Sequence, residues 1–276
     1  MAILLRFEVV KINLEEIYNR EKDKLHRLIK NDPVEFVHRY RDDRDREIAG
    51  FLASQFAYGK IDNFKRFLED AFRRMGSSPY QFVVNGDFNL LNGLYYRFQK
   101  EEDIILLFVI LRRIINKFGS IGNMLKFFYE GDMRNALWNA RKHLFSNDKD
   151  LIFFFPKQLP SNPMKRWNLY FRWMVRKDDI DVGLWDFIGK RDLVMPLDTH
   201  IFKIANCMGW INSNTPSYKA AVEITNKLKI FSPDDPLKYD FFLCHGVGIA
   251  AGCSGRRHSE CLNRCALTYM GWQNEI

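Results

Sequence analysis

Apolar residues recur at helical spacing along nearly the whole chain. Around residue 70 they lie three or four positions apart, on one helix face: Phe64, Phe67, Leu68 and Phe72. The segment 48–56 is apolar almost throughout, which indicates a buried helix. No pair of segments shows the two-residue alternation of paired strands, and no internal repeat is evident. The pattern predicts an all-α fold.

Glycine, proline and polar clusters divide this pattern into separate helices. Leu14 and Leu28 belong to an amphipathic N-terminal helix, and further helices are expected at 48–56, 64–72, 104–118, 121–129, 133–144, 164–177, 182–188, 199–209, 217–230 and 237–249. The one long irregular stretch, 146–163, carries three prolines. With 276 residues, we expect a single helical domain over 1–276, with lobes at about 1–150 and 164–276 joined by that stretch.

The net charge is +8 and the isoelectric point is near 9.2, which favours a polyanionic partner. Charge alone does not separate DNA from RNA or a membrane surface. Arg6 interrupts the apolar start, and the longest apolar run, 104–111, is too short to cross a bilayer. We therefore expect a cytoplasmic monomer that makes no membrane contact, with its five cysteines reduced.

The segment Pro196-Leu197-Asp198-Thr199-His200 places an aspartate where a helix begins. Asp is a favoured N-cap, so this residue alone predicts no more than a capped helix. The helix upstream adds to it. At about 100° per residue, one side of 164–177 is apolar and the opposite side carries Lys165, Leu169, Arg172 and Arg176. Such a basic stripe suits either a solvated face or a phosphate backbone.

Lys165 lies at the start of that helix, beside Arg166. The positive end of the helix dipole and the neighbouring cation both favour the neutral amine. A neutral amine can attack a sugar carbon and form a Schiff base. The alternative is a lysine that extends into water.

These segments resemble the helix-hairpin-helix DNA glycosylase superfamily, which includes endonuclease III-like proteins. The similarity lies in Leu52-Ala53-Ser54-Gln55, in Asp198-Thr199-His200-Ile201 and in Tyr239–Gly246, a helix that ends His-Gly. Residues 163–198 look like a microbial branch related to archaeal 8-oxoguanine DNA glycosylases. In that branch a lysine precedes the aspartate by some thirty residues, and Lys165 and Asp198 are 33 apart.

The resemblance implies a two-lobed helical enzyme that excises an oxidised purine such as 8-oxoguanine from duplex DNA, with an AP-lyase step. Lys165 would be the nucleophile, and Asp198 would stabilise the positive sugar. It also implies DNA contacts by Gln55, Arg166, Arg172, Arg176 and Lys203. Gln55 would fill the gap left by the extruded base, unless it is a buried core amide.

The chain departs from the family pattern at the hairpin, and this departure keeps alternatives open. The usual Leu-Pro-Gly-Val-Gly hairpin is replaced by the proline-rich stretch 156–163, so Lys177 and Lys190 compete as nucleophiles. A non-catalytic nucleic-acid-binding protein of the same fold, or an N-glycosidase acting on a nucleoside or an RNA base, are the other functions considered. His200 is expected to be structural, and His245 to cap a helix end rather than to face the pocket.

Three cysteines, Cys253, Cys261 and Cys265, follow the His-Gly helix with spacings of seven and three residues. The family carries four cysteines there for an iron–sulfur cluster, at different spacings. Cys244 would complete a set of four but is expected to be core, and His258 is another substitute. We expect no cofactor and a cluster loop that has lost its metal, with an iron–sulfur or zinc site as the alternative.

Overall fold

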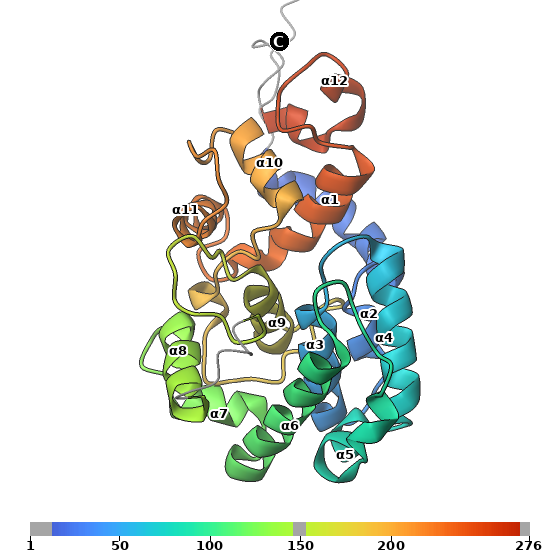
Figure 1. Cartoon of the computed structure of the whole chain (residues 1–276). Helices are drawn as coiled ribbons and strands as arrows, with labels where there is room; N and C mark the ends of the chain where they lie inside the picture. The colour runs from blue at the N-terminus through green and yellow to red at the C-terminus, as the bar shows by residue number, and fades with distance from the viewer. Residues whose placement is uncertain (1–12, 146–152, 271–276) are drawn as a thin grey trace, which may run out of the picture.

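The computed structural model describes residues 13–145 and 153–270. Within these ranges every regular element is a helix, apart from two isolated bridges that join Tyr96 to Gln99 and Lys177 to Val182. The predicted all-α fold is confirmed (Figure 1). No helix in these ranges is both long enough and apolar enough to cross a membrane.

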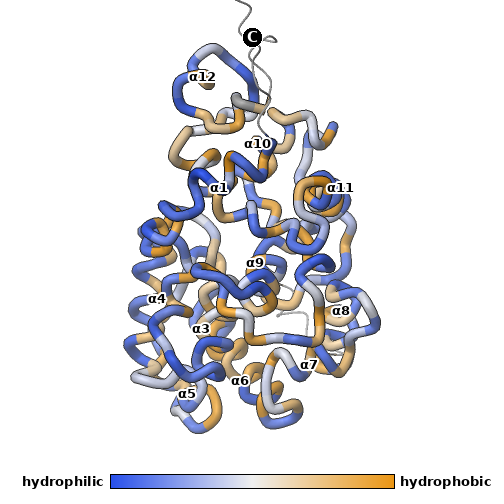
Figure 2. The backbone as a smooth tube through the Cα atoms, turned by 180° about the vertical axis from the view of Figure 1, so that it is seen from behind, coloured by the Kyte–Doolittle hydropathy of each residue, from blue (hydrophilic) through white to orange (hydrophobic). Residues whose placement is uncertain are grey.

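The first half of the chain contains α1 (Leu14–Leu25), η1 (His26–Asn31), α2 (Glu35–His38), α3 (Asp43–Gln55), α4 (Ile61–Met75), α5 (Pro79–Asn85), η2 (Phe88–Leu91), α6 (Glu101–Phe118), α7 (Ile121–Phe127) and α8 (Met133–Leu144). The second half contains α9 (Lys165–Val175), η3 (Lys190–Asp192), α10 (Thr199–Cys207), α11 (Tyr218–Lys229), η4 (Pro236–Tyr239), η5 (Phe242–Ala250), α12 (Cys261–Arg264) and η6 (Ala266–Met270). Hydrophobic and hydrophilic positions interleave along these helices, as amphipathic packing requires (Figure 2).

The expected helix at 182–188 is wrong. Val182 and Gly183 both donate their backbone N–H to the carbonyl of Trp173, at 3.0 and 3.1 Å, and Gly183 has a φ of +61°. This segment therefore folds back against the end of α9 instead of bonding to itself. The expected helix at 237–249 is divided into a 3-10 turn, η4, and a π-helix, η5.

The core centres on α3 and α9, which pack against each other. Phe51 makes edge-to-face contacts with Trp167 and Tyr170 of α9, with ring centroids 5.4 and 5.6 Å apart. Such aromatic pairs add to the free energy gained by burial. This packing fixes α9, whose first residue is Lys165, at the centre of the molecule (Figure 1).

The N-terminal helix α1 packs against η5 and η6, near the other end of the chain. Tyr18 of α1 meets Tyr239 edge to face at 5.4 Å, and Lys238 forms an ion pair with Glu15 at 2.7 Å. The first helix therefore lies with the C-terminal segments, whereas the expected lobe 1–150 had grouped it with α2–α8. Of the irregular stretch 146–163, residues 146–152 lie outside the described residues.

Candidate active site

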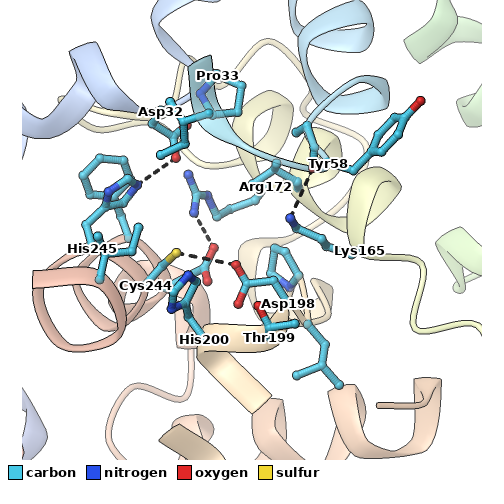
Figure 3. Close-up of a pocket in the computed structure, with 18 of the residues that line it drawn as sticks. Asp32, Pro33, Tyr58, Lys165, Arg172, Asp198, Thr199, His200, Cys244 and His245 are labelled. Carbon is cyan, nitrogen blue, oxygen red and sulfur yellow. Dashed lines mark hydrogen bonds and ion pairs between the residues drawn. The ribbon is translucent and has the colours of Figure 1, made fainter. Parts of the chain in front are cut away.

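A pocket of about 480 Å³ lies where α9, the start of α10 and the π-helix η5 meet. Ligand pockets in proteins commonly have volumes of this order. Its lining comes from the segments 31–33, 57–64, 163–172, 196–200 and 240–249, together with Pro216. Figure 3 shows Lys165, from α9, and Asp198, from the start of α10, at this one opening.

Asp198 is the N-cap of α10, as its position after Pro196 predicts. Its Oδ1 accepts the backbone N–H of Ile201 at 2.8 Å, and its Oδ2 accepts the Cys244 thiol at 3.6 Å. Burial raises the pKa of the Cys244 thiol well above its ordinary value, so this group remains a donor. The carboxylate is held in one orientation and has lone pairs left for a ligand.

Lys165 is the first residue of α9, as predicted, and its Nζ donates a hydrogen bond to the carbonyl of Ala57 at 3.2 Å. The preceding residue, Met164, is buried and has a φ of +56°, a left-handed conformation that is uncommon for residues other than glycine. Asn162 stabilises it by accepting the Met164 N–H at 2.9 Å. A strained residue at this point sets the direction in which α9 begins.

The competing lysines do not share the pocket. Lys177 and Lys190 are exposed, and neither belongs to the lining. The Nζ of Lys190 lies 3.9 Å from Oδ2 of Asp235. Lys165 is the one lysine among the described residues that lines the pocket with Asp198.

The prediction that Arg172 and Arg176 form an exposed basic stripe on α9 is wrong. Arg172 and Arg176 are only 2% and 5% exposed. Their guanidinium groups form a buried ion-pair network with four carboxylates: Asp178, Asp181, Asp235 and Asp240. Paired inside the protein, neither arginine is available to a phosphate backbone. Burial lowers the pKa of Arg172, but Asp181 and Asp240 outweigh it and raise that pKa above its ordinary value.

The other predicted DNA contacts have different surroundings. Gln55 is fully buried, so it is a core amide and does not reach a DNA duplex. Arg166 is half-buried, donates to the Gln55 carbonyl at 3.1 Å and covers the ring of Phe153 at 3.7 Å. Burial lowers the pKa of Arg166 to about 10. Lys203 is exposed on α10, where a contact with DNA stays a prediction.

The pocket lining carries three carboxylates, Asp32, Asp198 and Asp240, against two cations, Lys165 and Arg172. His245 contacts Asp32 through its Nε2 at 2.9 Å. Burial favours the neutral form of Asp32, but the hydrogen bond and charge of His245, the charge of Arg172 and the Val34 N–H together outweigh it and lower the pKa of the carboxyl. Asp240 is paired with Arg172 and Asp32 with His245, so Asp198 is the lining carboxylate that forms no ion pair among the described residues.

Sequence reasoning missed the roles of Asp32, Asp240 and Cys244. Asp240 gives a signal, since it is a carboxylate within the largely apolar segment 239–247. Asp32 gives none, because its partner His245 lies 213 positions away. Cys244 was expected in the core and His245 at a helix end, but both line the pocket, where Cys244 donates to Asp198 and His245 contacts Asp32. His200 also lines the pocket, and its expected structural role stays a prediction.

The remaining thiols gather at another place, beside the end of α10. Cys207 donates a hydrogen bond to Cys253. Cys261 and Cys265 are close enough to interact electrostatically with these thiols. Arg257 ties this loop to α10 by donating to the Cys207 carbonyl at 3.1 Å. Cys207, and not Cys244, is thus the fourth cysteine of the group. Within residues 13–145 and 153–270 no group of three or more His, Cys, Asp or Glu side chains is placed where it could hold a metal ion.

The fold and the site define an all-α protein with an amine and a carboxylate in one pocket. A family model described as "Protein of unknown function (DUF2400)" matches residues 32–250, and the chain belongs to that family. The match covers the whole pocket lining except Asn31 and stops before Cys253. Neither the curated proteins nor the solved structures contain a match to this chain.

Proposed function

We propose that this protein is a DNA N-glycosylase with AP-lyase activity that removes an oxidised purine such as 8-oxoguanine. The observation that carries the proposal is the shared pocket of Lys165 and Asp198, in which Asp198 forms no ion pair among the described residues. Cleavage of an N-glycosidic bond develops positive charge on the sugar, and fixed negative charge stabilises it.

In the proposed reaction, the neutral amine of Lys165 attacks C1′ of an extruded nucleotide. The C1′–N9 bond breaks, and its electron pair leaves with the base. Asp198 stabilises the cationic sugar, accepts the proton that the attacking nitrogen loses and passes that proton to the departing base. The sugar opens to an imine on Lys165, and loss of a proton from C2′ then eliminates the 3′ phosphate. Water finally releases the sugar from the lysine.

The surroundings of both groups suit these roles. Asp198 uses its Oδ1 for the Ile201 amide at 2.8 Å, which fixes the carboxylate without neutralising it. Lys165 is restrained by a single hydrogen bond, to the Ala57 carbonyl at 3.2 Å, among the contacts of the described residues. Its long side chain can leave that carbonyl and reach a sugar carbon at a small cost in free energy, because only one hydrogen bond is lost.

Borohydride trapping on duplexes with single defined lesions tests the proposal. Wild-type protein is expected to form a covalent adduct, and Lys165→Ala to form none. Asp198→Asn should lower the excision rate by about 100-fold or more, the usual scale for a group that assists proton transfer. Lys177→Ala is the matched control, because Lys177 is exposed and outside the pocket; it should trap like wild type.

Full trapping by Lys165→Ala would remove this lysine from the mechanism. Salt-sensitive duplex binding without product on any lesion would instead indicate a non-catalytic nucleic-acid-binding protein. Competition of free nucleosides or RNA with duplex DNA for the pocket would indicate an N-glycosidase of another substrate class.

A further inference from the structure

A turn beside the pocket exposes two aromatic rings. Tyr95 and Phe98, between η2 and α6, are 76% and 70% exposed. Exposed aromatic rings next to a binding site commonly mark a contact surface. Arg97, between them, holds its guanidinium 5.3 Å from the Phe98 ring, so a cation accompanies the apolar side chain.

The turn is narrow and its backbone is strained. Tyr96 and Gln99 exchange backbone hydrogen bonds of 2.9 and 3.0 Å, which leaves Arg97 and Phe98 as the two residues of the loop. Arg97 has a φ of +55°, and the first position of such a two-residue turn usually carries glycine or asparagine. Strain of this kind often accompanies a functional position.

Hydrogen bonds fasten the turn to the pocket wall. The Tyr96 hydroxyl donates to the Tyr58 carbonyl, and the Tyr58 hydroxyl lies 3.3 Å from the Tyr96 carbonyl and also contacts Gln99. The Arg97 guanidinium lies 5.8 Å from the Tyr58 ring. Tyr58 and Gly59 line the pocket, so the exposed rings have a fixed position relative to Lys165 and Asp198.

We infer that Phe98 is the wedge that enters the DNA base stack when a nucleotide is extruded into the pocket, with Arg97 against a neighbouring phosphate. The inference rests on the proposed function and supplies the gap-filling residue that the fully buried Gln55 does not. Extrusion breaks stacking on both sides of the vacated position, and an inserted apolar side chain restores part of it. The cation next to the ring matches the charge of the DNA backbone.

Phe98→Ala is compared with Phe127→Ala, a matched control. Phe127 is 72% exposed and lies on α7, outside the pocket lining and at the opposite end of the molecule from α12 (Figure 1). Excision is measured on one lesion in a duplex and in a single strand. Phe98→Ala should lower the ratio of duplex to single-strand rate roughly tenfold, the scale of one lost stacking contact. Phe127→Ala should keep the wild-type ratio, and Phe98→Trp should restore most of it.

A second measurement separates this inference from the proposed function. In a Lys165→Ala background, affinity is measured for a duplex with a tetrahydrofuran abasic analogue and for the intact duplex. We expect tighter binding to the abasic duplex than to the intact one. If adding Phe98→Ala abolishes this difference in affinity, the wedge is supported even if the protein excises nothing. Equal behaviour of Phe98→Ala and Phe127→Ala in both assays overturns the wedge, whatever the fate of the glycosylase proposal. Equal unfolding temperatures of both variants establish that folding is not the cause.

Discussion

Asp198 uses one carboxylate for two purposes. Oδ1 closes the first turn of α10, and Oδ2 faces the pocket with the Cys244 thiol beside it. The capping role and the proposed catalytic role were alternatives in the sequence, but the geometry makes them compatible. A capped aspartate is held rigidly, and rigid placement of charge is what electrostatic stabilisation of a reacting sugar requires.

At the same scale, Cys253 should be an unusually reactive thiol. The hydrogen bond from Cys207 lowers the pKa of Cys253 to about 6, against the opposing effect of burial. Because the thiolate is the reactive form, alkylation by iodoacetamide should be half-maximal near pH 6, below the ordinary thiol value of about 8.5. Mass spectrometry of the Cys253 peptide across pH gives the midpoint. Cys207→Ala should return it toward 8.5, and an unshifted wild-type midpoint would contradict the assignment.

Arg172 and Arg176 of α9 show which features a sequence pattern can predict and which it cannot. The helical spacing of Lys165, Arg172 and Arg176 identifies a shared face, but not the groups that cover it. Asp181 follows Arg172 by nine positions and Asp240 by 68. Local periodicity carries no information about such partners, so a buried ion-pair network and an exposed basic stripe look alike in sequence.

Among the elements, α7 begins on a carboxylate supplied by another helix. Glu47 of α3 is buried and accepts the backbone N–H groups of Ile121 and Gly122 at 3.1 and 2.9 Å, and the indole N–H of Trp185 at 3.0 Å. One side chain thus joins α3, the start of α7 and the segment that folds back after α9. The helix N-terminus receives the negative charge that it favours.

Glu47→Gln should destabilise the protein by about 1–3 kcal/mol, because the amide NH₂ would replace one acceptor among N–H donors. Thermal unfolding followed by circular dichroism should show a midpoint several degrees lower, the shift expected for a chain of this length. The exposed Glu130→Gln is the control and should leave the midpoint within error. A Glu47→Gln protein as stable as wild type would mean that these hydrogen bonds contribute little.

Helix positions were predictable where the apolar period is strong and a cap closes each end. The helix expected at 133–144 is α8, with the same bounds, and Asp132 caps it. The segment 182–188 was not predictable, because its backbone donors bond to carbonyls at the end of α9 and not within the segment. The π-helix η5 was also missed, since its wider turns leave no signal separate from an apolar α-helix.

On the scale of the whole molecule, distant parts of the chain close around the pocket. Asp32 follows η1 near the N-terminus, whereas His245 belongs to η5 near the C-terminus, and their contact of 2.9 Å joins the two. The pairing of Lys165 with Asp198 in one pocket was implied by the family resemblance. The contact between Asp32 and His245 could not be predicted, because no sequence pattern pairs two residues so far apart.

This contact predicts an acid-sensitive contribution to stability. The pKa of Asp32 is lower in the folded state than its ordinary value near 3.9. The contribution is therefore complete above that value and is lost as pH falls through the folded pKa. Asp32→Asn should cost about 1 kcal/mol or more at pH 7 in urea unfolding, and the gap from wild type should narrow between pH 4 and 2. A gap that stays constant down to pH 2 would contradict this linkage.

The π-helix η5 makes the pocket sensitive to the number of residues in the chain. Its i→i+5 bonds, such as Ala251 N–H to Gly246 C=O at 3.3 Å, each span one more residue than the hydrogen bonds of an α-helix. Cys244 and His245 both belong to this wider helix, and both line the pocket. Deleting a single residue from η5 would convert it toward an α-helix and rotate the side chains that line the pocket. The number of residues in this helix is therefore a constraint on the pocket, in addition to their identity.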